Sequence, residues 1–135
     1  MATAERKHWI RAALVAGGWY FVVGRVFALP TRHVQAWRLA AWAVSGIIYA
    51  THIWLEHDRR RSSPLVTATH VAVGAAIGGF LLAVAGMIHS LSTTPTIRPI
   101  WLLSLVLWPA ITGLPGFVGA FVAAKVLPRR SDGPP

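Results

Sequence analysis

Four long apolar stretches alternate with short polar connections along the chain. They cover residues 9–29, 34–55, 65–91 and 100–127. A helix needs about 20 predominantly apolar residues to cross about 30 Å of hydrocarbon, and each stretch is long enough to do so. The pattern predicts an all-α membrane protein in which residues 1–128 form a single transmembrane four-helix domain. The polar tail that follows, residues 129–135, is predicted to be disordered.

The first stretch carries the weakest signal for a transmembrane helix. Arg11 and Arg25 leave only residues 12–24 free of charge between them. Both side chains would therefore have to extend toward opposite headgroup layers. A cleaved signal peptide is the alternative for a basic, apolar segment of this kind. Arg25 interrupts the apolar region, however, and no small-x-small cleavage site follows it, so we predict a membrane span.

The other three stretches differ in how they begin and in what interrupts them. The second has Arg38 in its first turn, and the third contains no Asp, Glu, Lys or Arg. Ser63 and Pro64 precede the third stretch as a hydroxyl cap and a first-turn proline. The fourth stretch contains Pro109 and Pro115, which predict a kink. The carbonyls that the prolines free would be satisfied by Thr112 or by neighbouring helices.

The short connections predict that consecutive helices are antiparallel neighbours in an up-down-up-down bundle. The distribution of cations sets the orientation, because Lys and Arg gather on the cytoplasmic side of membrane proteins. Nine cations lie on one side and four on the other, which predicts a multi-pass protein of a bacterial-type inner membrane with both termini in the cytoplasm. The nine are Arg6, Lys7, Arg11, Arg59, Arg60, Arg61, Lys125, Arg129 and Arg130, and the four are Arg25, Arg32, Arg38 and Arg98.

Composition supports the membrane class. The chain is 55% hydrophobic and only 13% charged, whereas a soluble domain carries roughly 25% charged residues. A net charge of +9 would suggest nucleic-acid binding in a soluble protein. Here the cations fall in small groups between apolar runs, so we expect anionic lipid headgroups as partners and no nucleic acid. The absence of cysteine excludes disulfides, thiolate metal sites and cysteine nucleophiles.

Small residues in the third stretch predict close helix packing. Gly74 and Gly78 lie one turn apart, and Gly79 begins a second small-residue row beside them. In lipid, helices associate through close backbone contact more than through apolar area. These glycines are predicted to pack the four helices of one chain, with homo-oligomerisation as the alternative.

The most suggestive polar residues are His52, Glu56 and His70. His52 and Glu56 are four residues apart and would share a helical face, whereas His57 would point elsewhere. The short connection after Glu56 would bring His70 to a similar depth. We therefore predict one polar site between the second and third helices near the cytoplasmic surface.

This site has several chemical interpretations. Two imidazoles and a carboxylate are a minimal ligand set for a divalent metal such as zinc or non-haem iron. A proton relay and axial haem ligation by His52 and His70 are further alternatives. In the structural alternative Glu56 pairs with Arg59 or Arg60, and the histidines bond to each other, to nearby threonines or to water.

Sequence features that the chain lacks argue against some classes of membrane protein. The predicted spans have no central carboxylate, which argues against a small proton-coupled exporter, and the standard membrane hydrolase motifs are not present. The first expectation is a non-enzymatic accessory or structural membrane subunit. A metal- or cofactor-linked protein using the His/Glu site is the second. An oligomeric transporter of small solutes or ions, with the proline-containing helix lining the pathway, is the third.

Overall fold

The structure is a computed structural model that describes residues 2–94, 96 and 99–128, with side chains from residue 7 onward. Within these residues it contains helices and no strands, which confirms the all-α prediction. The predicted disordered tail lies outside the described residues. The elements are α1 (Ala2–Val26), α2 (Val34–Trp54), the π-helical turn η1 (Leu55–Arg59), α3 (Pro64–Thr93) and α4 (Pro99–Val126).

The local sequence explains where α2 and α3 begin. His33 adopts a left-handed backbone conformation with φ of 54°, and α2 starts at the next residue. Ser63 precedes α3 in an extended conformation, and its Oγ accepts a hydrogen bond of 3.3 Å from the Val66 amide. Pro64 then occupies the first helical position, where its missing N–H has no cost. The predicted start of the third helix is therefore confirmed.

Helix α4 continues through both Pro109 and Pro115, so neither proline ends it. The Thr112 hydroxyl lies 2.9 Å from the Trp108 carbonyl and 3.1 Å from the Ala75 carbonyl of α3. It makes no hydrogen bond with the carbonyls four residues before the two prolines. Of the two partners expected for those carbonyls, Thr112 is not the one: its hydroxyl bonds to its own preceding turn and to α3. The alternative, that neighbouring helices satisfy them, stays a prediction. A bend near the prolines stays a prediction.

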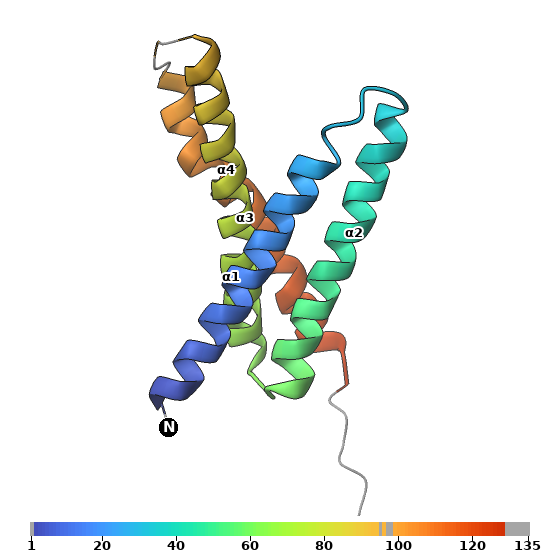
Figure 1. The fold of residues 1–135 in the computed structure, drawn as a ribbon. Coiled ribbons are helices and arrows are strands. Elements are labelled where there is room, and N and C mark those ends of the chain that lie inside the picture. Colours follow the sequence, from blue (N-terminus) through green and yellow to red (C-terminus); the bar gives the residue numbers. More distant parts are fainter. Residues whose placement is uncertain (1, 95, 97–98, 129–135) are drawn as a thin grey trace, which may run out of the picture.

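The helices form two hairpins that meet at one end and diverge at the other (Figure 1). One hairpin is α1 and α2, and the second is α3 and α4. Helix α3 packs extensively along both α4 and α1, whereas α2 touches each of the other helices over a smaller area. We call the end with the N-terminus and η1 the closed end, and the end with residues 27–33 the open end.

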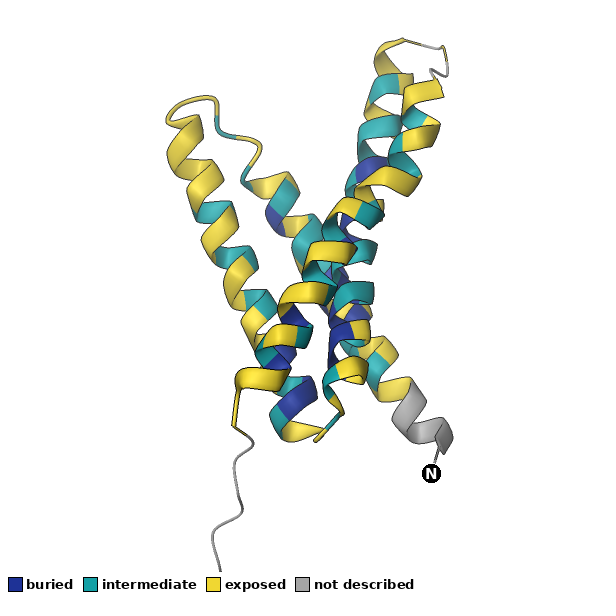
Figure 2. Cartoon of the chain, turned by 180° about the vertical axis from the view of Figure 1, so that it is seen from behind, coloured by how far each residue is buried: buried dark blue, intermediate teal, exposed yellow. Residues whose placement is uncertain are grey.

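Buried residues gather where the helices cross and toward the closed end (Figure 2). Ile53 of α2, Ala68 and Val71 of α3, and Ala120 of α4 form one buried apolar cluster there. The buried apolar residues are mainly alanines, together with two valines and one isoleucine. Many large apolar side chains instead face outward, and Trp42 of α2 is 79% exposed.

Glycines of α3 allow two neighbouring helices to approach closely. A Cβ on Gly78 would lie 2.6 Å from the Cβ of Tyr20 on α1. A Cβ on Gly79 would lie 2.9 Å from the Trp108 carbonyl oxygen on α4. Adjacent glycines therefore serve different interfaces within one chain.

Two helices, α3 and α4, are long and apolar enough to cross a membrane. In α1 and α2, the arginines identified from the sequence interrupt the apolar segments: Arg11 and Arg25 in the first, and Arg38 in the second.

Candidate functional site

The candidate site is centred on the carboxylate of Glu56, which lies on η1 and is fully buried. Its Oε1 accepts a hydrogen bond from Nη1 of Arg60 in an ion pair one turn along the chain. Its Oε2 lies 2.7 Å from Nδ1 of His70 on α3. Both carboxylate oxygens therefore have partners within the chain. Of the two arginines that the sequence proposed as partners, the structure places Arg60 on Glu56.

Arg60 connects the carboxylate to α1. Its side chain is 32% exposed, and its Nη2 donates a hydrogen bond of 3.1 Å to the backbone carbonyl of His8. The guanidinium thus uses one nitrogen for η1 and another for α1. A planar group with several fixed donors suits this double role.

His70 connects the carboxylate to α1 by a second route. Its ring stacks on the indole of Trp9 with centroids 4.4 Å apart and an angle of 3° between the planes. The stack holds the imidazole in position while Nδ1 faces Glu56.

His57, the next residue along η1, contacts α4 instead. It is buried, and its Nε2 lies 3.3 Å from the carbonyl oxygen of Leu127, just after α4 ends. As predicted, His57 points away from the polar site. It nevertheless contacts another helix through the Leu127 carbonyl. With Glu56 it links η1 to each of the other helices at the closed end.

The placement of His52 differs from the prediction. Its side chain is buried, yet neither ring nitrogen has a hydrogen-bond partner in the structure. The ring packs against α3, where a Cβ on Gly74 would lie 3.1 Å from Cε1 of His52. The expectation that His52, Glu56 and His70 are all within hydrogen-bond reach is therefore wrong for His52 and right for the other pair.

The geometry bears on the metal hypothesis. In the described part of the chain, no three side chains of the His, Asp and Glu types are arranged to hold a metal ion. Glu56 and His70 bond to each other, and Arg60 adds a cation to the same carboxylate. The guanidinium of Arg60, paired with this carboxylate, offsets the negative charge that would attract a divalent cation. This arrangement is suited to joining helices.

Sequence reasoning missed Trp9 and Leu127 as parts of this cluster. Trp9 fitted the general pattern of tryptophan near a membrane surface, and that pattern does not identify a stacking partner. Leu127 contributes only a backbone carbonyl, for which the residue type gives no signal.

The chain matches no known protein family, no curated protein and no solved structure. Functional inference therefore rests on the geometry described above.

Proposed function

We propose that this chain is a multi-pass membrane protein that acts as a non-enzymatic accessory or structural subunit. The carrying observation is that Glu56, a fully buried carboxylate, uses both oxygens for partners in its own chain. A catalytic carboxylate needs an oxygen that can reach substrate or exchange a proton with it. Glu56 offers none, and its contacts fasten helices together.

The distribution of apolar side chains supports a lipid environment. Most buried apolar residues are small and many large ones face outward, with Leu39 69% and Trp42 79% exposed. In water this surface would be an aggregation hazard, whereas in lipid it is well solvated and close packing through small residues holds helices together. The proposed spans are α1 to α4, crossing the membrane in an up-down-up-down order.

Charge supports an arrangement with the closed end in the cytoplasm of a bacterial-type cell. Exposed Lys7, Arg11 and Arg59 lie at that end and suit anionic lipid headgroups. The guanidinium of Arg59 also lies 5.4 Å from the ring centroid of Trp54, a pairing typical of the headgroup layer. A second copy or another membrane subunit would cover part of the exposed apolar faces.

Cysteine labelling tests the membrane arrangement directly, because the chain has no cysteine of its own. Four single variants sample the two ends of the molecule. Lys7→Cys and Ser63→Cys lie at the closed end, and Thr31→Cys and Thr96→Cys lie at the open end. A maleimide that cannot cross the membrane should label positions 31 and 96 in intact cells. Positions 7 and 63 should react only after the membrane is permeabilised. Labelling of position 7 or 63 in intact cells would contradict the proposed orientation.

Two measurements on purified protein test the non-enzymatic role. Metal analysis after purification without chelators should find no stoichiometric divalent metal, and proteoliposomes should take up no more small solute than empty vesicles. Stoichiometric metal that disappears in Glu56→Gln would favour the metal-linked alternative. Solute uptake that depends on the protein would favour a transport pathway.

A further inference from the structure

The open end of the molecule carries cations that the chain itself does not neutralise. No Asp or Glu occurs between residues 6 and 55 or between residues 59 and 131. The carboxylates of Glu56 and Asp58 lie beyond the other end of α2, about 30 Å away at 1.5 Å per residue. Arg25 and Arg38 both lie near the open end, and within the described residues neither forms an ion pair or a side-chain hydrogen bond.

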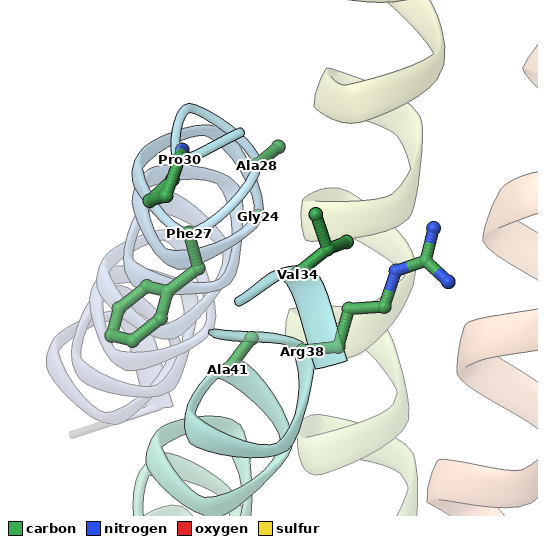
Figure 3. A pocket seen from close by; sticks show the side chains of 7 residues that line it. All are labelled: Gly24, Phe27, Ala28, Pro30, Val34, Arg38 and Ala41. Atoms are coloured by element: carbon green, nitrogen blue, oxygen red, sulfur yellow. The ribbon is translucent and has the colours of Figure 1, made fainter. Parts of the chain in front are cut away.

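A pocket lies beside one of these arginines, between the end of α1 and the start of α2 (Figure 3). It is a half-open hollow of about 220 Å³, and its lining includes Phe27, Pro30, Val34 and Ala41. Arg38 is the single charged residue among the seven that line it. Six of the seven lining residues therefore have apolar side chains or none, and one cation adds to the polar part of the lining.

Figure 3 shows how Arg38 lies in this pocket. Its aliphatic stem borders the apolar lining, and its guanidinium extends away from Phe27 and Pro30. Arg38 is the fifth residue of α2, so it lies roughly 6 Å from the start of the helix. In a membrane-spanning α2, this depth places the guanidinium at the boundary between headgroups and hydrocarbon.

The floor of the pocket is held in place by contacts within the hairpin. The rings of Phe27 and Trp37 form an edge-to-face pair with centroids 5.6 Å apart. This pair joins the residue after α1 to the first turn of α2. The pocket is thus part of the folded hairpin.

We propose that this pocket binds an anionic phospholipid of the outer leaflet, with the phosphate on Arg38 and the first part of an acyl chain against the apolar lining. The inference rests on the proposed membrane arrangement. An unpaired guanidinium at the membrane surface attracts anions, and the phosphate oxygens match its donors. The apolar lining favours an amphiphile over free phosphate, because only the amphiphile also removes that surface from water.

The test compares lipids by their effect on thermal unfolding of the full chain in neutral detergent micelles, because a ligand that binds only the folded state raises the melting temperature. The additions are phosphatidylglycerol, phosphatidylcholine and inorganic phosphate. Arg38→Gln removes the proposed phosphate contact, and Ala41→Leu fills the pocket while leaving the arginine. Arg11→Gln is the matched control, since it removes one exposed cation at the closed end.

Phosphatidylglycerol should raise the melting temperature of the parent more than phosphatidylcholine does. Arg38→Gln should need a roughly fivefold higher phosphatidylglycerol concentration for half of that shift, as expected for about one lost arginine contact. Ala41→Leu should also need a higher concentration, because its larger side chain takes the place of the acyl chain. Arg11→Gln should behave like the parent. An equal loss in Arg11→Gln would indicate diffuse attraction to anionic lipid and overturn the pocket.

Two further outcomes would also overturn the proposal. If inorganic phosphate reproduces the full shift, the pocket is an anion site that needs no lipid. If phosphatidylglycerol raises the melting temperature no more than phosphatidylcholine does, the pocket does not select an anionic lipid. Failure of the proposed function looks different from these results. A chain that is not a membrane protein would stay monodisperse without detergent, which is measured on the same preparation before any lipid is added.

Discussion

Nδ1 of His70 lies 2.7 Å from Oε2 of Glu56, although 14 residues separate the two in sequence. The contact joins α3 to the turn that follows α2, and the carboxylate is fully buried. Glu56→Gln should lower the free energy of unfolding by about 2 kcal/mol, because the amide places an N–H₂ group against a charged donor. Thermal unfolding in detergent, followed by circular dichroism, measures this loss.

The matched control for this substitution is Asp58→Asn. Asp58 lies on the same π-helical turn and is only partly buried. The substitution removes the same charge without touching the Glu56 contacts, so unfolding should stay within about 0.5 kcal/mol of the parent. Equal losses in the two variants would mean that net charge, and not the buried contact, determines the effect.

Gly78→Leu should destabilise the contact between α1 and α3. A Cβ at this position would lie 2.6 Å from the Cβ of Tyr20, so the helices would have to separate. Overpacking of this kind costs about 1–3 kcal/mol. Gly46→Leu is the control, because no atom lies within 4 Å of a Cβ built at Gly46. Equal melting temperatures of Gly78→Leu and the parent would contradict this packing.

The two tyrosines of the chain should respond differently to the loss of their hydroxyls. Tyr49 donates a hydrogen bond of 2.7 Å to the Gly116 carbonyl and so joins α2 to α4. The Tyr20 hydroxyl is buried without a partner. Tyr49→Phe should cost about 1 kcal/mol of stability, whereas Tyr20→Phe should be neutral or stabilising. The comparison fails if Tyr20→Phe is the more damaging of the two in thermal unfolding.

Hydrophobic patterning was sufficient to predict four helices and where α2 and α3 begin. The start of α3 was readable because Ser63 and Pro64 act locally, through a cap and a fixed backbone angle. The sequence placed the start of α1 at residue 9, whereas the helix begins at Ala2. The residues before position 9 are mostly polar or basic, so hydrophobic periodicity cannot show that the helix already includes them.

The candidate site was only half predictable because the helix changes its period there. The residues from Leu55 to Arg59 form a π-helical turn, which inserts extra backbone into each turn. Counting 100° per residue from His52 therefore misplaces Glu56. The pairing of Glu56 with His70 followed from the short connection, whereas the isolation of His52 depends on this turn and on the space left by Gly74.

His52 provides the sharpest test of whether the buried polar residues are structural or functional. Both ring nitrogens are buried without hydrogen-bond partners, and a buried unsatisfied polar group costs about 1–3 kcal/mol. His52→Leu removes that cost and places an apolar side chain beside Gly74 and the buried Ile53. Its melting temperature should therefore equal or exceed that of the parent. A melting temperature several degrees lower would show that the imidazole has a partner, such as a bound water or ion. Metal analysis of the parent and the variant would then distinguish these two partners, since a bound metal ion would be lost with the imidazole.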